Sequence, residues 1–429
     1  MLNRTSPPPA QALSPVKLPT FQRRELSNGL PVYLLPFGSV EVAEVQMVFR
    51  AGSALQPASG VARYTARMMS EGTRQFSSLA LAQQLDGHGA WLNQDVDEDS
   101  FAFKLATVSD KLTETLPLLS EVILAPTFPA DEWDKMKQRS LETLAVNEEK
   151  TSFLARRHFN ALLYGAGHPY GSSTLREDLE RITREQLQAY HQEYLYLGNA
   201  YLAVVGRFDE AAVLGLLEDH FGKVSLASGV EETSAAVTAQ AENNLGRHHI
   251  AKEGMQSTVR LGHLAVARSH PDFYRLSVVN TLLGGYFGSR LMKNIREEKG
   301  FTYGIGSGLA ALKHDGFFII QADTGNEYVE PLIKEVKIEM RRLAESGVDA
   351  AELDLVKNYL LGKAISQRET PFQLSDTLRY ALSHGLSFEQ LDRRFEVIQS
   401  MEVDEVAFLA KKYFKPDEML EVVVGQAAE

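Results

Sequence analysis

Residues 60–73 read Gly60-Val-Ala-Arg-Tyr-Thr-Ala-Arg-Met-Met-Ser-Glu-Gly-Thr73. The apolar periodicity over about 61–70 predicts a helix. Arg63 and Arg67 are four residues apart, so they share one face of that helix. A guanidinium has five donors, no acceptor and a permanent charge, so this pair cannot bind a metal cation. Taken alone, the segment is an ordinary helix with two surface arginines.

The same segment resembles the metal-binding helix of the pitrilysin-type zinc metallopeptidases, the inverzincins. That helix normally reads Gly-Leu-Ala-His-Phe-Leu-Glu-His-Met-Leu-Phe-Glu-Gly-Thr, and the flanking glycine, methionine and Glu-Gly-Thr are kept here. The two zinc-binding histidines correspond to Arg63 and Arg67, and the catalytic glutamate corresponds to Ala66. Because zinc requires neutral imidazole or carboxylate, the resemblance implies a lost zinc site and no metal in this chain.

The family's third zinc ligand is a glutamate on a later helix. Its place aligns with Ala145, in the segment Leu144-Ala-Val-Asn-Glu-Glu-Lys150. Glu142, Glu148 and Glu149 lie close by, so they stay open as alternatives. None of the eleven histidines has another four residues away, so the sequence holds no second H-x-x-E-H or H-E-x-x-H motif.

The amino-acid composition limits the classes of protein to which the chain can belong. The chain has 429 residues, 44% hydrophobic and 23% charged, as in soluble globular proteins. Its net charge of −12 argues against a general nucleic-acid or anionic-membrane binder, and the absence of cysteine excludes disulfides and thiol catalysis. Residues 1–20 hold five prolines and no hydrophobic core of a signal peptide, and they read as an extended lead-in. A bacterial periplasmic location is favoured, and the cytoplasm stays open.

The order of strands and helices repeats weakly along the chain. We predict a first half at 21–224, a linker at 225–247 and a second half at 248–429. Each half is expected to be α+β, with strands on one side of a helical layer. The resemblance implies two duplicated α/β-sandwich domains, each an antiparallel-rich sheet covered by helices, that form half of a clam-like chamber.

Two helical predictions bear on the architecture. The segment from Pro129 to Tyr164 is expected to be long and helical. In the second half the predicted helices are Asp272–Leu283, Tyr328–Ser346, Ala350–Gln367, Pro371–Ser383 and Val403–Tyr413.

A second family stretch is Ser289-Arg-Leu-Met-Lys-Asn-Ile-Arg296-Glu-Glu-Lys-Gly-Phe-Thr-Tyr303. In active members an arginine and a tyrosine seven residues later hold the substrate and polarise its scissile carbonyl. Arg296 and Tyr303 match that spacing. Guanidinium and phenol donors suit a developing negative charge on oxygen. The alternative is a helix-ending arginine that happens to precede a strand-starting tyrosine.

The chain thus resembles the non-zinc subunit of heterodimeric pitrilysin-type peptidases. The resemblance implies a partner that bears H-x-x-E-H and zinc, to whose site Arg296 and Tyr303 contribute in peptide hydrolysis. This chain alone is expected to have no activity. The alternative is a non-catalytic structural or peptide-binding protein, similar to the core subunits of respiratory complexes. An independent peptidase lacks a ligand set in this sequence, and a homodimer would contain no zinc site.

Overall fold

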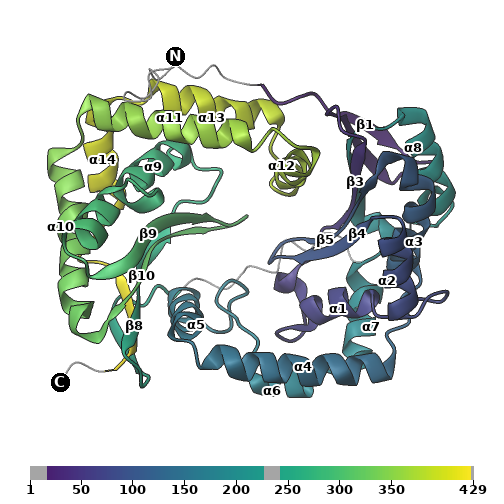
Figure 1. The fold of residues 1–429 in the computed structure, drawn as a ribbon, viewed down its shortest axis with the longest axis horizontal. Helices are drawn as coiled ribbons and strands as arrows, with labels where there is room; N and C mark the ends of the chain where they lie inside the picture. Colours follow the sequence, from purple (N-terminus) through teal and green to yellow (C-terminus); the bar gives the residue numbers. More distant parts are fainter. Residues whose placement is uncertain (1–16, 227–241, 427–429) are drawn as a thin grey trace, which may run out of the picture.

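The computed structural model describes residues 17–226 and 242–426 (Figure 1). Most of the predicted lead-in at 1–20 and most of the predicted linker at 225–247 lie outside these residues. In the described part of the chain, no helix combines the length and apolar character needed to cross a membrane.

The first half forms a six-stranded sheet with the order β1-β2-β6-β3-β5-β4. Strands β2 and β6 pair in parallel, and the other neighbours pair antiparallel. The strands are β1 (Gln22–Glu25), β2 (Pro31–Pro36), β3 (Val42–Phe49), β4 (Trp91–Val96), β5 (Phe101–Val108) and β6 (Ala200–Gly206). The helices are α1 (Val61–Met69), α2 (Ser78–Gly87), α3 (Leu112–Leu124), α4 (Ala130–Glu148), α5 (Thr151–Tyr164), α6 (Arg176–Arg181), α7 (Arg184–Tyr194) and α8 (Glu210–Leu217).

The second half forms a five-stranded sheet with the order β7-β11-β8-β10-β9. Here β7 and β11 pair in parallel, and the other neighbours pair antiparallel. The strands are β7 (Gly246–Ala251), β8 (Gln256–Ala265), β9 (Thr302–Ala311), β10 (Gly316–Gly325) and β11 (Leu420–Gly425). The helices are α9 (Phe273–Asn280), α10 (Val329–Ser346), α11 (Ala350–Ser366), α12 (Pro371–Ser383), α13 (Phe388–Ser400) and α14 (Val403–Tyr413).

The two sheets share one topology. Without β1, the first order reads β2-β6-β3-β5-β4, and it matches β7-β11-β8-β10-β9 strand for strand. In both sheets the parallel pair joins the strand that comes first along the chain to the strand that comes last: β2 to β6, and β7 to β11. The predicted duplication of an α+β unit is therefore confirmed, and it makes β4 and β9 equivalent edge strands.

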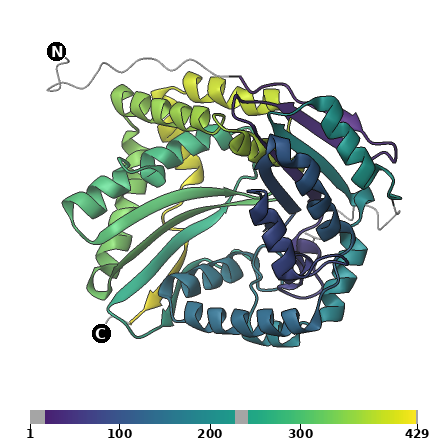
Figure 2. The ribbon, with the colours of Figure 1, turned by 45° about the vertical axis from the view of Figure 1, so that its right-hand side comes forward.

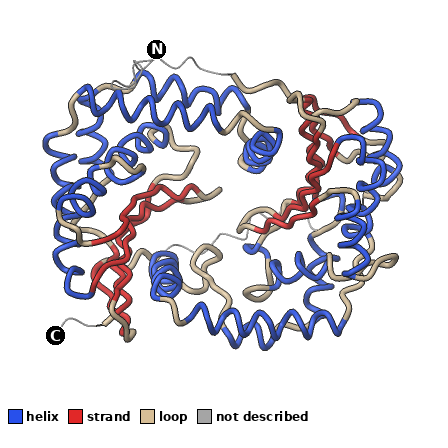
Figure 3. Tube along the Cα trace, viewed as in Figure 1, coloured by secondary structure: helices blue, strands red, loops and turns tan. Residues whose placement is uncertain are grey.

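Each sheet is covered on one face by a helix from the other half (Figure 1, Figure 3). Helix α5 of the first half packs on β11 and β8, and α12 of the second half packs on β6 and β3. A buried apolar cluster under α12 joins Leu378 to Val48 and Val205. A matching cluster under α5 contains Phe159 and Val422. In the turned view, the long strands of the second half extend toward the first half (Figure 2).

This exchange changes two of the predictions. The sheets do not simply lie on one side of a helical layer, because their second face is covered by the exchanged helix. The segment Pro129–Tyr164 is not one helix but two, because Lys150 has an extended ψ of 123° between α4 and α5. That break sends α5 to the second sheet. Helix α13 is not in the predicted set, although its Ser387 and Gln390 form a capping box.

Polar contacts also hold α12 against the first sheet. Lys104 of β5 lies 2.6 Å from a carboxylate oxygen of Asp376, on α12. Arg379 of the same helix pairs with Asp95 and Asp97 at the tip of the β4–β5 hairpin. Asp97 also accepts hydrogen bonds from backbone N–H groups of the turn, so the tip is held by its own hydrogen bonds as well as by α12.

We expect Leu378→Ala to lower the free energy of unfolding by about 2–5 kcal/mol, because it empties a fully buried site between α12 and the first sheet. Urea denaturation measures this change. Hydrogen exchange should show lower protection in β3 and β6, although they belong to the other half of the chain.

Leu355→Ala is the matched control, because Leu355 is 54% exposed on α11. Its effect should stay within about 0.5 kcal/mol. A loss of protection confined to α12 in Leu378→Ala would contradict the coupling between the halves.

Candidate functional site

The start of α1 keeps a well-defined frame. Gly60 precedes the helix with a left-handed φ of 100°, which favours glycine. A β-carbon there would also lie 3.0 Å from the side chain of Thr174. Gln56 Oε1 accepts hydrogen bonds from the backbone N–H groups of Gly60 and Ala62, at 3.0 and 3.2 Å. These bonds satisfy donors that a helix start leaves free.

Helix α1 is amphipathic, as its sequence predicts. Seven of its nine residues are buried, whereas Arg63 and Arg67 are exposed on one face. Ala66 is 2% exposed and packs in the core of the first half. In the described part of the chain neither arginine forms an ion pair. The degenerate motif therefore presents two unneutralised guanidinium groups and no acceptor.

The two arginines line a cavity of about 480 Å³. Helix α5 contributes Arg156 and Arg157 to the same cavity. Glu98 also lines it, and burial, with Asp97 and Asp99 nearby, raises the pKa of this carboxyl. Among the described lining residues four arginines face this one acidic residue, and because only Arg157 has a carboxylate partner, Glu148, the cavity has an excess of positive charge.

Helix α4 provides the wall opposite α1. Ala145 is exposed and is not among the residues that line the cavity. Thr143 lines it, and together with Arg67 it also lines a neighbouring cavity of about 350 Å³. The residues of α4 on the cavity side are Ser140, Thr143, Leu144 and Asn147.

The acidic alternatives on this part of the chain are not aimed at α1. Glu148 accepts a hydrogen bond from Arg157 at 2.6 Å, and Glu149 accepts one from Lys252 at 2.7 Å. Glu142 is exposed on α4. Across residues 17–226 and 242–426, no three His, Cys, Asp or Glu side chains are grouped so that they could hold a metal. The residues around α1 do not fit a zinc ion.

The second predicted pair lies in the other half. Arg296 belongs to the π-helical segment η7 (Met292–Glu298), and Tyr303 is the second residue of the edge strand β9. Tyr303 is 93% exposed. The guanidinium of Arg296 lies 4.7 Å from the ring centre of Phe287, which is itself 67% exposed. Neither Arg296 nor Tyr303 lines the cavity of Arg63 and Arg67.

The backbone that carries this pair is fixed. Asn294, which precedes Arg296, donates to Glu339 at 2.6 Å from a buried position. Thr302, which precedes Tyr303, donates to the backbone carbonyl of Asp323 at 2.6 Å. Tyr303 is therefore an exposed donor and Arg296 a partly exposed one, and both lie on an ordered frame.

Four residues around these sites are not among those predicted from the sequence: Thr143, Arg156, Arg157 and Phe287. The adjacent arginines are visible in the sequence, but their place depends on the break between α4 and α5. Phe287 sits in a glycine-rich turn, and its contact with Arg296 follows from the path of that turn.

Two family models match the chain. The model described as "Insulinase (Peptidase family M16)" matches residues 38–177, and the one described as "Peptidase M16 inactive domain" matches residues 181–360. An "Uncharacterized zinc protease" of Rickettsia felis is 24% identical over 399 residues, covering 92% of this chain and 95% of the relative. A "Non-peptidase homolog YmxG" of Helicobacter pylori is 24% identical over 404 residues, covering 92% and 90%.

Solved structures agree with the family models. The peptidase M16 inactive domain from Pseudomonas fluorescens superposes with a TM-score of 0.86 at 27% identity, covering 95% of this chain and 98% of that one. A protease from Helicobacter pylori superposes with a TM-score of 0.87 at 22% identity, covering 95% and 100%, and this likeness shows the shared fold. The chain belongs to the M16 peptidase family.

Proposed function

We propose that this chain is the non-zinc subunit of a two-subunit zinc endopeptidase. It pairs with a chain that carries H-x-x-E-H, and it contributes Arg296 and Tyr303 to that chain's site. The observation that carries the proposal is the solvent-accessible pair of donors, Arg296 partly and Tyr303 fully exposed, on an ordered frame in a protein whose α1 offers arginines in place of zinc ligands.

The proposed role requires only hydrogen-bond donors and a positive charge from this chain, and Arg296 and Tyr303 supply both. The partner's zinc, when bound, supplies the hydrolytic chemistry. As the peptide bond is attacked, its carbonyl oxygen gains negative charge, and preorganised donors stabilise that charge. Arg296 supplies a permanent positive charge and Tyr303 a hydroxyl donor. Both can hold a peptide carbonyl without any proton leaving this chain.

A second candidate is a peptide-binding protein with no catalytic role. The observation that favours it is the cationic cavity beside α1, where Arg63 and Arg67 lack ion-pair partners within the described residues. Guanidinium groups bind carboxylates with two parallel hydrogen bonds. Such a protein would retain acidic peptides without cleaving them, whether or not a zinc-bearing partner is present.

We expect the purified chain to retain no zinc and to cleave no fluorescence-quenched peptide. Mixing it with an H-x-x-E-H chain of the same organism should give strong peptidase activity in a zinc-containing complex. Metal analysis and the peptide assay measure both points. Zinc-dependent cleavage by this chain alone would refute the proposed division of roles.

In that complex, Arg296→Ala and Tyr303→Phe should each lower kcat/KM by about 100- to 1,000-fold, the usual effect of removing a donor to a developing oxyanion. Arg393→Ala and Tyr328→Phe are matched controls, because they remove an exposed arginine and a half-exposed tyrosine elsewhere in the same half. Full activity of Arg296→Ala in an assembled complex would remove the catalytic role and leave the peptide-binding candidate.

The lost zinc site can be tested by restoring it. We expect Arg63→His, Ala66→Glu and Arg67→His combined with Thr143→Glu to bind one zinc ion, because Thr143 and both arginines line one cavity. The same three changes combined with Ala145→Glu should bind zinc more weakly, because Ala145 does not line it. Zinc titration compares the two. Equal or tighter binding by the Ala145→Glu set would place the third ligand at residue 145.

A further inference from the structure

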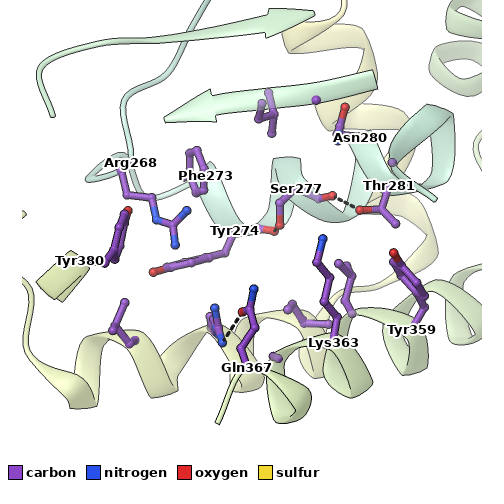
Figure 4. Close-up of a pocket in the computed structure, with 18 of the residues that line it drawn as sticks. Arg268, Phe273, Tyr274, Ser277, Asn280, Thr281, Tyr359, Lys363, Gln367 and Tyr380 are labelled. Carbon is purple, nitrogen blue, oxygen red and sulfur yellow. Dashed lines mark hydrogen bonds between the residues drawn. The ribbon is translucent and has the colours of Figure 1, made fainter. Parts of the chain in front are cut away.

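The second half contains a separate cavity of about 740 Å³ (Figure 4). It lies among α9, α11, α12, α13 and β9, and neither Arg296 nor Tyr303 lines it. Its size falls in the range of small-molecule sites, which hold about 300–1,000 Å³. A cavity of this kind is open to a ligand independently of the proposed peptidase role.

Arg268 is fixed in this cavity by aromatic rings. Its guanidinium lies 4.8 Å from the ring centre of Phe273, 5.3 Å from that of Tyr274 and 4.8 Å from that of Tyr380. Figure 4 shows it reaching between Tyr380 and the other two rings. Its Nε is buried and has no hydrogen-bond partner among the described residues. Stacking orients the guanidinium but leaves its donors unused.

Arg394 of α13 is a second cation with unused donor capacity. Its Nε is also buried without a partner in the described chain, and its one hydrogen bond, to Gln367, is long at 3.5 Å. Burial, together with the charges of Arg368 and Arg268, lowers the pKa of Arg394 to about 10. The neighbouring Arg368, by contrast, pairs with Asp392 at 2.7 Å. Arg268 and Arg394, both partly buried, therefore have no carboxylate partner among the described residues.

The other charged residues that line the cavity in the described chain do not provide an acidic partner for Arg268 or Arg394. Lys363 adds a third cation, and it points from α11 toward α9 (Figure 4). Asp376 is the one carboxylate among the described lining residues, and it is paired with Lys104 at 2.6 Å. The chain as a whole carries a net charge of −12, so this local excess of positive charge runs against the composition.

We propose that this cavity binds a small organic anion. Its carboxylate or phosphate group lies between Arg268 and Arg394, where both guanidinium groups have donors to spare. Its body packs on the tyrosines, since Tyr274, Tyr359 and Tyr380 line the remaining space. The buried hydroxyl of Tyr380, which has no partner among the described residues, offers a further polar contact. The volume is too large for an inorganic ion alone, so a ring-bearing anion fits best.

The test is calorimetric titration of the full chain with phenyl phosphate, benzoate and inorganic phosphate. We expect at least one ring-bearing probe to bind about tenfold more tightly than inorganic phosphate. Tighter binding of phenyl phosphate would identify a phosphate ligand, and tighter binding of benzoate a carboxylate. Arg268→Gln and Lys363→Gln should weaken the better probe, the first by about tenfold or more. Lys363 is exposed, so its substitution leaves folding intact.

Arg394→Met separates binding from a structural role. It removes an unpaired, desolvated charge, so the Tm without ligand should rise, while the probe should no longer raise the Tm. Arg260→Gln is the matched control, because burial also lowers the pKa of Arg260 to about 10 but this arginine does not line the cavity. Arg260→Gln should bind the probe normally. No binding of any probe at millimolar concentration, or unchanged binding by folded Arg268→Gln, would overturn the proposal.

Discussion

The exchange of one helix between the halves is the packing on which the remaining structure depends. Helix α12 lies on β3 and β6, and α5 lies on β8 and β11. These strands are buried on both faces, so Ala200–Gly206 reads AYLAVVG without the polar alternation of a half-exposed strand. Each apolar side chain that the exchanged helix buries contributes about 1.5–3 kcal/mol. The face of each sheet that the exchanged helix covers is therefore stabilised by the other half of the chain.

The same exchange determines what surrounds the two cavities. Because α5 leaves α4 at Lys150, it carries Arg156 and Arg157 to the face of α1 that holds Arg63 and Arg67. Helix α12 contributes polar residues to the cavity of Arg268, while its opposite side packs on the first sheet. Both cavities are thus bounded by an exchanged helix. A ligand in either one would contact an element whose position depends on the other half.

Much of this organisation could be predicted from the sequence. The Asn28-Gly29 pair predicts a hairpin, and Gly29 indeed has a φ of 90° between β1 and β2. The helix at residues 61–70 and the duplication also follow from local patterns. The partner of each exchanged helix does not, because contacts between residues so far apart leave no local periodicity. The third-ligand position depends on the register of α4: positions 143 and 145 are about 200° apart around a helix, so a two-residue change of alignment moves a side chain to the other face.

The segment that resembles a zinc motif carries positive charge at Arg63 and Arg67. Alanine at these positions would leave Arg156 and Arg157 as the arginines of the cavity, whereas Arg63 and Arg67 add two fixed positive charges on α1. Arg296 and Tyr303, and likewise Arg268 and Arg394, are also hydrogen-bond donors that lack a protein acceptor in the described chain. Three separate places therefore offer donors to an incoming oxygen atom. An oxygen of a peptide carbonyl, a carboxylate or a phosphate satisfies all three, and a metal ion satisfies none. Donors of this kind recognise oxygen-bearing ligands, so the three places share one binding chemistry.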